Sequence, residues 1–303
     1  MAGSQDYARD SRNETALVYL NGALVQRSQA RVSVFDAGFA LGDGVWEGLR
    51  LHRGKLLFLE AHLDRLFAGA AAIRLDIGLS RTQITAALYD LVRANGMSDG
   101  VHLRLMATRG EKATVNQDPR HALGQPTIAI TAEYKTPSAE NARRGLKLFT
   151  SSIRCSAADT FDMRLNSHSR LNLIRALLEA IDAGADEALM LDPEGLVSSC
   201  NATNFFCVRA GRVITSDGRF CFNGITRGHV ITLCRGAGIE ILLGGLRLED
   251  ARTADEAFVT GTLGGLTPVR EIDGHAMQAV PGPITTRLRG LYSALMEQEA
   301  ASA

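Results

Sequence analysis

Along the first half of the chain, apolar and polar residues follow patterns typical of a sheet packed against helices. Two short apolar runs around Asn21-Gly22 predict a hairpin over residues 18–25. Alternating apolar and polar residues predict further strands over residues 31–35, 45–52, 101–108 and 127–132. Apolar residues at helical spacing predict helices over residues 59–70 and, after an N-cap at Ser80, over residues 80–96. Charged residues, proline and glycine mark residues 109–124 as a loop.

The second half of the chain mixes short strands with longer helices. Strands are predicted over residues 146–150, 187–191, 196–198, 204–209, 213–215, 256–260 and 269–272. Helices are predicted over residues 167–183, 224–236 and 283–299, and loops over residues 155–164 and 261–265. The first of these helices carries one apolar face, made of Leu171, Ile174, Leu178 and Ile181, and we expect it to end at Gly184.

These patterns predict an α+β protein of two domains. The apolar pattern breaks near the middle of the chain, at a run that contains Pro137 and Ser138. We therefore expect a mobile tail over residues 1–14, an N-terminal α/β domain over residues 15–134, a linker over residues 135–145 and a C-terminal α/β domain over residues 146–303.

Composition narrows the class of protein. The 303 residues are 46% hydrophobic and 22% charged, and Lys+Arg equals Asp+Glu at 33 each. Balanced charge favours neither nucleic acid nor an anionic membrane as a partner. The chain has no apolar run long enough to span a bilayer and no secretory h-region near its start. Its 5 cysteines show no C-x-x-C spacing, which favours buried thiols of a cytoplasmic protein over a metal site or disulfides.

An ordered series of short motifs runs through both predicted domains. Each is weak alone, and a glycine-rich loop, a helix cap or a surface ion pair would explain any one of them. In order they are Phe39-x-x-Gly42-Asp-Gly-Val-Trp-Glu47, His62-x-x-Arg65-Leu, Gly184-Ala-Asp-Glu-Ala-Leu, Asn204-Phe-Phe, Gly224-Ile-Thr-Arg227, Ala254-Asp-Glu-Ala-Phe and Thr260-Gly-Thr262.

Taken together, this series resembles the class IV aminotransferases, the fold-type-IV pyridoxal-phosphate enzymes that include branched-chain aminotransferases. The resemblance covers about residues 17–295. It implies two domains with the active-site cleft between them, a homodimer, a pyridoxal or pyridoxamine 5′-phosphate cofactor and small amino- and keto-acid substrates. It also implies a set of groups around the cofactor phosphate: the Arg65 guanidinium, the loop of Gly224, Ile225 and Thr226, and the later loop of Gly261 and Thr262. Leu263 is bulkier than the resemblance leads us to expect in that later loop.

The resemblance also exposes two departures at the cofactor ring. Counting back from Gly184 without gaps places Asn166 where the family has the lysine that joins the cofactor through a Schiff base. An amide cannot form that bond. Ser199 stands where the family places a carboxylate that keeps the pyridine nitrogen protonated. His168 and Arg170 are then the remaining candidates for proton transfer, although His168 could equally cap a helix.

Candidate substrate contacts lie in the N-terminal domain. Trp46 belongs to the glycine-rich motif, and Arg104 matches an arginine of the branched-chain group, with His102 in the place of a tyrosine. Arg104 would orient a substrate carboxylate or form a structural ion pair. Thr114 and Asn116 stand where D-amino-acid transaminases carry a carboxylate trap, which disfavours D-amino acids.

Three functions remain open from the sequence. The first is a branched-chain-aminotransferase-like protein that holds its cofactor without a covalent link and transaminates weakly or atypically. The second is a non-catalytic or cofactor-independent protein that uses the cleft for another ligand. The third and weaker one is an aminodeoxychorismate-lyase-like activity, which also needs the missing lysine.

Overall fold

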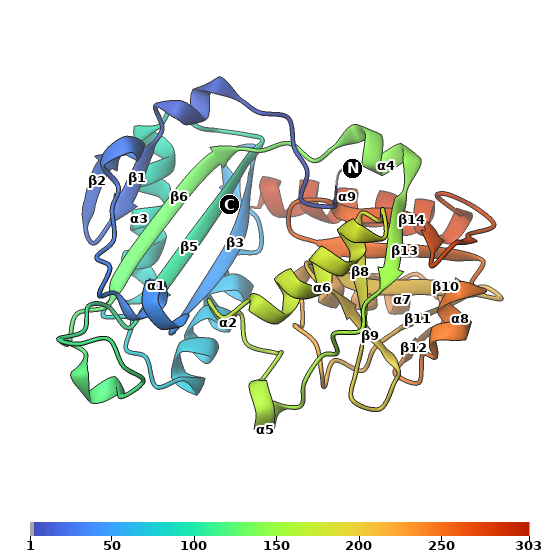
Figure 1. The fold of residues 1–303 in the computed structure, drawn as a ribbon. Helices are drawn as coiled ribbons and strands as arrows, with labels where there is room; N and C mark the ends of the chain where they lie inside the picture. The colour runs from blue at the N-terminus through green and yellow to red at the C-terminus, as the bar shows by residue number, and fades with distance from the viewer. Residues whose placement is uncertain (1–2, 303) are drawn as a thin grey trace. The chain divides into compact units, whose positions relative to one another are not determined.

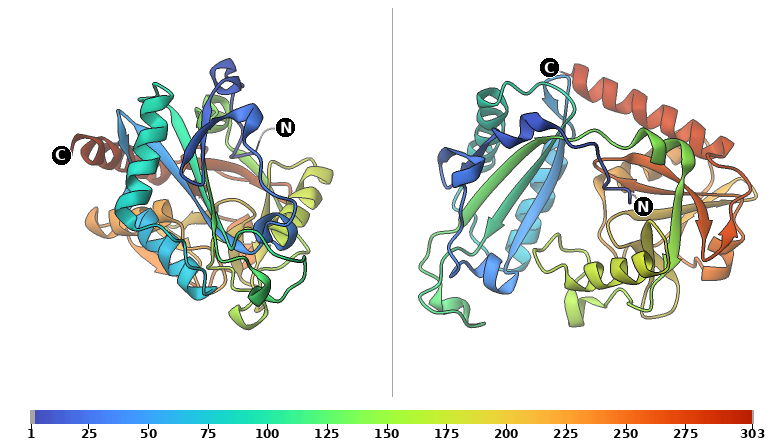
Figure 2. Two further views of the ribbon diagram at one scale, coloured as in Figure 1. Left: turned by 90° about the vertical axis from the view of Figure 1, so that its left-hand side faces the viewer. Right: turned by 45° about the horizontal axis from the view of Figure 1, so that its top comes forward.

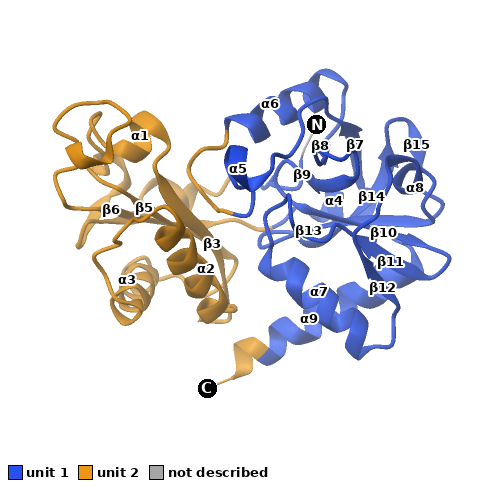
Figure 3. Ribbon diagram, turned by 90° about the horizontal axis from the view of Figure 1, so that it is seen from below, with its two compact units in different colours: residues 1–8, 137–164, 171–298 blue, residues 9–136, 165–170, 299–303 orange. Residues whose placement is uncertain are grey.

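The protein consists of two compact units, coloured separately in Figure 3, and the computed structural model describes residues 3–302. Unit 1 comprises Met1–Ala8, Pro137–Arg164 and Leu171–Gln298. Unit 2 comprises Arg9–Thr136, Leu165–Arg170 and Glu299–Ala303. The short stretch Leu165–Arg170 therefore belongs with the N-terminal half of the chain, although the sequence on both sides of it belongs to the other unit.

Unit 2 is built on a six-stranded antiparallel sheet (Figure 1). Across the sheet the strands are β2 (Ala23–Gln26), β1 (Leu17–Leu20), β6 (Thr127–Tyr134), β5 (Val101–Thr108), β3 (Gly44–His52) and β4 (Lys55–Leu56). Helices α2 (Leu59–Ala72) and α3 (Arg81–Ala94) cover one face of this sheet (Figure 2). Shorter helices are η1 (Ser11–Glu14), η2 (Arg27–Gln29), α1 (Ala37–Leu41) and η3 (Pro119–His121).

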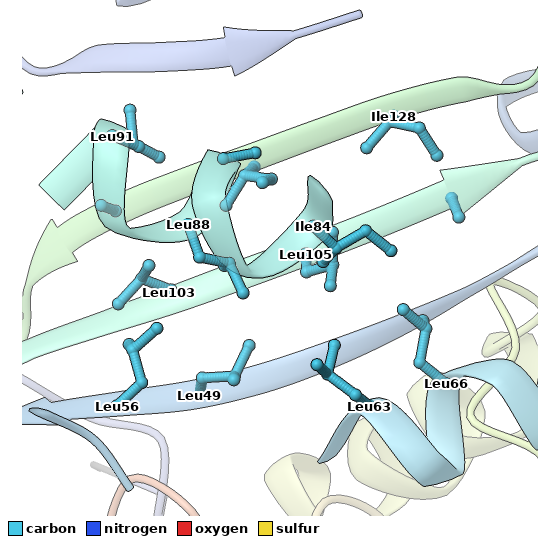
Figure 4. Packing of buried hydrophobic residues seen from close by; sticks show 14 of the residues in the cluster. Leu49, Leu56, Leu63, Leu66, Ile84, Leu88, Leu91, Leu103, Leu105 and Ile128 are labelled. Atoms are coloured by element: carbon cyan, nitrogen blue, oxygen red, sulfur yellow. The ribbon is translucent and has the colours of Figure 1, made fainter. Parts of the chain in front are cut away.

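The core of unit 2 lies between that sheet face and the two helices. Leu49 of β3 and Leu103 and Leu105 of β5 pack against Leu63 of α2 and Leu88 of α3, and all five are at most 1% exposed (Figure 4). Since side chains alternate along a strand, Trp46 of β3 and Arg104 of β5 point to the opposite face. That face carries the candidate substrate contacts.

Unit 1 is built on a nine-stranded mixed sheet. The strands run in the order β12 (Ile241–Leu243), β11 (Arg212–Thr215), β10 (Asn204–Arg209), β13 (Glu256–Gly261), β14 (Gly265–Ile272), β7 (Leu146–Thr150), β8 (Glu187–Leu191) and β9 (Val197–Cys200), and β15 (His275–Ala276) pairs with β14. Its helices are α4 (Ala139–Arg144), α5 (Ala158–Phe161), α6 (Leu171–Asp182), α7 (Ile225–Gly236), α8 (Leu248–Arg252) and α9 (Pro283–Ala301). The α+β class is confirmed.

Helix α6 packs on the sheet through small residues. Ala176 and Ala180 are fully buried, and Leu173 packs beside them. The apolar face predicted from the sequence is a different one: Leu171, Ile174, Leu178 and Ile181 are 69%, 52%, 53% and 45% exposed. The periodicity correctly indicated a helix but not which of its faces is buried in unit 1.

Several predicted elements are wrong in extent or type. The loop predicted over residues 155–164 contains α5, and the linker predicted over residues 135–145 contains α4. Residues 31–35 form no strand, because the chain turns where Asp36 N–H donates to Ser33 O (3.0 Å) and the Asp36 carboxylate then caps α1. The helix predicted from residue 167 begins only at Leu171. Residues 166–168 are extended instead and pair with β3, as described below.

The ends of the chain contact the folded units. Ser4 N–H donates to Glu187 Oε1 (3.1 Å), and the Gly3 carbonyl accepts from Asn141 Nδ2 (2.9 Å). Asn13 exchanges hydrogen bonds with the backbone of Tyr134 (2.8 and 3.0 Å). The tail predicted over residues 1–14 thus makes specific contacts from residue 3 onward, and residues 1 and 2 lie outside the described residues.

Two further observations bear on the expectations from composition. All five cysteines are buried thiols, as expected. Within residues 3–302, no helix combines the length and the apolar character that crossing a membrane requires.

Candidate active site

Residues 166–168 lie along the beginning of β3 as a short added strand. Trp46 N–H donates to Asn166 O (2.9 Å), and His168 N–H donates to Gly44 O (2.9 Å). Ser167 forms an antiparallel bridge with Val45 between these two bonds. The pairing fixes the candidate catalytic segment to the strand that carries Trp46, and it explains why this segment is not helical.

The side-chain amide of Asn166 is engaged at both ends. Its Nδ2 donates to Trp46 O (2.6 Å), and its Oδ1 accepts a hydrogen bond from Arg170 Nη2. Asn166 is 5% exposed. Because both polar ends of this buried amide form hydrogen bonds, the Asn166 side chain is held in one orientation in the site.

Two guanidinium groups lie against the Trp46 indole. The Arg104 Cζ is 3.7 Å and the Arg170 Cζ is 5.1 Å from the ring centroid. Such cation–π contacts stabilise a cation and hold a planar ring in place. The indole Nε1 donates to Ser167 O (3.1 Å), so the ring is fixed at its edge as well. The structure thus brings together four of the predicted site residues: Trp46, Arg104, Asn166 and Arg170.

Burial and the positive charges of neighbouring arginines lower the pKa values of the basic groups in this cluster. Burial, followed by the charges of Arg104 and Arg65, lowers the pKa of Arg170 to about 10, so that it stays protonated near neutral pH. Burial likewise lowers the pKa of Arg104. The pKa of His168 is lowered by burial, and Arg104 and Arg170 act in the same direction. His168 is therefore neutral near pH 7, and burial and the two guanidinium groups disfavour its protonated form.

Two polar atoms beside Asn166 are buried and have no hydrogen-bond partner among the described residues. They are Ser167 Oγ and His168 Nε2. Buried polar atoms normally have a hydrogen-bond partner. The two atoms beside Asn166 are therefore candidates to bind a ligand or water.

Arg65 is held in place by a buried carboxylate. Its Nε donates to Glu47 Oε1 (2.8 Å) and its Nη2 to Glu47 Oε2 (2.7 Å), while His62 Nδ1 donates to the same Oε2 (2.7 Å). Burial by itself would raise the pKa of Glu47, but the hydrogen bonds from Arg65 and His62 hold it below its ordinary value. This ion pair orients the guanidinium predicted to bind phosphate.

In unit 1, the loop before α7 is anchored by Asn204. Its Nδ2 donates to Phe222 O (2.7 Å), and its Oδ1 accepts from Gly224 N–H (3.2 Å). A Cβ at Gly224 would lie 2.4 Å from that oxygen, so any larger residue would displace the Asn204 side chain from its hydrogen bonds. Gly224 begins the 12-residue helix α7 without a side-chain cap, which leaves the positive end of the helix suited to an anion.

The loop of Gly261 and Thr262 follows a strand that pairs with the strand of Asn204. Asn204 pairs in register with Thr260, the residue before Gly261, across β10 and β13. Thr226 is buried, and its hydroxyl lies 3.4 Å from that of Tyr292. Asn204 therefore connects the two predicted phosphate loops of unit 1, through its side chain to Gly224 and through strand pairing to the residue before Gly261.

Ser199 belongs to a buried hydroxyl and carboxyl network. Its Oγ donates to Thr203 O (2.8 Å), and Thr203 Oγ1 donates to Glu187 Oε2 (2.7 Å). Burial raises the pKa of Glu187. Ser199 therefore already uses its proton within unit 1.

Three lysines have their contacts elsewhere in the described part of the chain. Lys147, expected at an edge or on the surface, forms an ion pair with Glu271 on β14 (3.1 Å). Lys112 donates to Asp118 O (2.7 Å), and Lys55 to Ser302 O (2.6 Å). Burial lowers the pKa of Lys135.

Sequence reasoning gave no role to Glu47, His62 or Asn204, although each stood inside a motif. A signal for Glu47 was present in the alternation of β3, where it occupies a core-facing position between Val45 and Leu49. A carboxylate at a core position needs a cationic partner, and Arg65 was the candidate.

The chain matches a known protein family over most of its length. The family model described as amino-transferase class IV matches residues 44–272. The chain belongs to this family.

Relatives in the class IV family match nearly the whole chain. The chain is 38% identical over 286 residues to branched-chain-amino-acid aminotransferase-like protein 2 of Arabidopsis thaliana, covering 94% of this chain and 51% of the relative. It is 34% identical to the branched-chain-amino-acid aminotransferase of Pseudomonas aeruginosa, covering 91% of each. The chain thus spans about half the length of the Arabidopsis relative.

A solved class IV structure confirms the predicted fold. The branched-chain amino acid aminotransferase of Thermobaculum terrenum, in its PLP (holo) form, superposes with a TM-score of 0.84 at 28% identity, covering 95% of each chain. The class IV aminotransferase fold and the likeness to branched-chain aminotransferases are therefore established for this chain.

Proposed function

We propose that this chain binds pyridoxal or pyridoxamine 5′-phosphate without a covalent link and acts as a weak or atypical transaminase of the branched-chain type. The carrying observation is that Asn166, at the lysine position, is buried and satisfied at both ends, while Arg65 is firmly oriented. The residues of the two phosphate loops fit a phosphate. The residues around Asn166 do not fit a Schiff base.

Each residue has a defined part in this proposal. Arg65 and the N-terminus of α7, with Gly224, Ile225 and Thr226, would hold the phosphate, and Gly261 and Thr262 would complete its surroundings. When bound, such a cofactor supplies a ring that draws electrons from a substrate carbon. Trp46 would pack against the substrate, and Arg104 would orient its carboxylate. His168, whose Nε2 is buried, would relay a proton with water, while Arg170, which stays protonated near neutral pH, would act through its charge and not as a proton carrier.

Titration of the purified chain with each cofactor form tests this proposal. Thermal stability and the visible spectrum would be followed, and borohydride reduction with intact mass would then report any covalent adduct. We expect stabilisation without a reducible adduct, because a ligand that binds only the folded state raises its stability. A specific adduct would show that one of the four lysines supplies the amine, and an ordinary transaminase would replace this proposal.

A second function is favoured by the closed arrangement of Asn166, Arg170 and Trp46. We propose as the alternative a non-catalytic or cofactor-independent protein that reuses the same residues for another ligand. Ser199 also has its hydroxyl directed to Thr203 O, away from a role as an acid. Absence of stabilisation by either cofactor form would favour this alternative over the first.

We also propose that the protein is a homodimer and that the exposed apolar face of α6 takes part in it. Four large aliphatic side chains in one helical stripe are unusual on a free surface and typical of a protein contact. The molecular mass in solution tests this, and a monomer would contradict it. The cytoplasmic location stays a prediction.

A further inference from the structure

The place of the missing amine is bordered by a permanent positive charge. Arg170 Nη2 donates to Asn166 Oδ1, and the Arg170 guanidinium lies 5.1 Å from the centroid of the Trp46 ring. In an ordinary family member the lysine would change between a free amine, a cation and a bound form. Here the same corner holds an amide and a guanidinium, which neither react with a carbonyl nor give up charge near neutral pH.

The charges around this corner are predominantly positive. Arg104 lies over the same indole at 3.7 Å, and Arg65 is close enough to act on Arg170 electrostatically. Glu47 acts on Arg170 in the opposite direction, but its two oxygens accept hydrogen bonds from Arg65 and His62. A further cation brought to Asn166 would therefore meet like charge in a partly dehydrated place, where the repulsion is strong.

We propose that Asn166 and Arg170 make this site select phosphorylated ligands whose group facing Asn166 is neutral, and reject ligands that carry a positive charge there. This inference rests on the proposed function, because it assumes that the phosphate end of the ligand is held as described. It assigns a specific ligand class: a phosphorylated pyridine that bears an alcohol or aldehyde is preferred to one that bears an ammonium group.

Two probes share the same ring and phosphate and differ only in the group that would face Asn166. A difference in their affinities therefore reports the effect of that group. Pyridoxine 5′-phosphate carries a neutral alcohol and cannot react with lysines, whereas pyridoxamine 5′-phosphate carries an ammonium group. Calorimetric titration of the full chain gives the dissociation constant of each. We expect pyridoxamine 5′-phosphate to bind roughly tenfold more weakly, the size that one unit charge at this range produces in a partly screened place.

Two variants of Arg170 form a matched pair for this test. Arg170→Gln removes the charge and keeps a donor for Asn166, and Arg170→Lys keeps the charge and loses the planar fork. We expect Arg170→Gln to reduce the difference between the two dissociation constants to about threefold, because Arg104 and Arg65 keep their charges, and Arg170→Lys to retain the full difference. Far-ultraviolet circular dichroism and the unfolding midpoint would establish that both variants are folded.

The outcomes separate this inference from the proposed function. Equal binding of the two probes by the native protein would overturn the inference and leave the proposed function standing. A preference that is undiminished in Arg170→Gln would also overturn it, because the charge at Arg170 would then contribute nothing. Failure of both probes to bind would overturn the proposed function, and this inference with it.

Discussion

Asn166 and Glu47 show how single side chains set the character of this protein. Asn166, which the family resemblance places at the lysine position, is an amide whose two ends are held by Trp46 O and Arg170. Glu47 places a carboxylate, 1% exposed, at a core-facing position and uses it to orient Arg65 and His62. In the function proposed above, Asn166 cannot form a covalent link, whereas Glu47 keeps Arg65 oriented to bind phosphate.

Restoring the amine tests the assignment of Asn166. We expect Asn166→Lys to give a weak borohydride-reducible adduct with pyridoxal 5′-phosphate, because Arg170 would lower the pKa of the new amine and leave more of it nucleophilic. Asn166→Lys combined with Ser199→Glu should give a larger adduct fraction, since a carboxylate keeps the pyridine nitrogen protonated. Intact mass after reduction measures both, with the native chain treated in parallel. If the folded double variant forms no adduct, Asn166 does not occupy the lysine position.

The Glu47 ion pair predicts a defined pH dependence. Folding lowers the pKa of Glu47 from 4.5, so its contribution to stability is complete above pH 4.5 and is lost as the pH falls through the folded pKa. Glu47→Gln should lower the free energy of unfolding by about 3 kcal/mol at neutral pH, because it leaves Arg65 without its buried counter-charge. The difference between native and variant should shrink below pH 4.5.

Urea unfolding at neutral pH and below pH 4.5 measures the difference in unfolding free energy between the native protein and Glu47→Gln. Glu60→Gln is the matched control, since the Glu60 side chain lies on helix α2 with Arg65 but is 80% exposed. A Glu47 variant as stable as the Glu60 variant would show that the buried pair adds nothing to stability.

At the scale of elements, some segments adopt the structure that their local sequence predicts, and others adopt a structure set by pairing with a distant strand. Helix α3 follows its local signals: Ser80 Oγ accepts from Gln83 N–H, and the Gln83 side chain accepts from Ser80 N–H (2.8 Å), which completes a capping box. Residues 166–168 have helical surroundings in the sequence, yet they pair with β3. Pairing satisfies the backbone groups of both segments at once, which a longer α6 would not do for β3.

The capping box of α3 predicts a local loss of stability. Ser80→Ala should lower the free energy of unfolding by about 1 kcal/mol, because it removes the acceptor for one N–H at the first turn. Thr82→Ala, at an exposed position of the same turn, is the control and should have a much smaller effect. Denaturant midpoints of the two variants measure the difference, and equal midpoints would show that the capping box does not contribute.

At the scale of the whole molecule, α6 has one buried face and one exposed apolar face. Ala176 and Ala180 pack on the sheet of unit 1, and the aliphatic stripe from Leu171 to Ile181 faces outward. The helix is therefore apolar on both sides, which is typical of an element buried between its own unit and another chain. In the homodimer proposed above, the exposed face of α6 would contact the second copy of the chain.

A charge in the middle of the stripe should dissociate the dimer. We expect Leu178→Lys to shift the native mass from that of a dimer toward that of a monomer, because burying an unpaired ammonium in an apolar contact is strongly unfavourable. Light scattering after size exclusion measures the mass. Leu242→Lys, at a 46% exposed position on β12, is the control and should leave the mass unchanged. A Leu178 variant with the native mass would place the contact elsewhere.

The sequence by itself determined the elements whose signals are local. The turn at Asn21-Gly22, the capped start of α3 and the alternation of β5 and β7 were all predicted close to their observed bounds. The motif series identified the class IV family, because that series depends only on the order of residues along the chain. The departures at Asn166 and Ser199 rest on the same order of motifs and stay predictions.

Only the tertiary structure decided which residues meet. The contacts of Glu47 with Arg65, of Asn166 with Trp46, and of Asn204 with Gly224 all join segments far apart in the chain. Residues 31–35 became a turn, and the predicted apolar face of α6 lay outward, because local periodicity reports that a face is apolar and not what covers it. Packing and backbone pairing settle that choice, since their free energy arises only when distant segments are brought together.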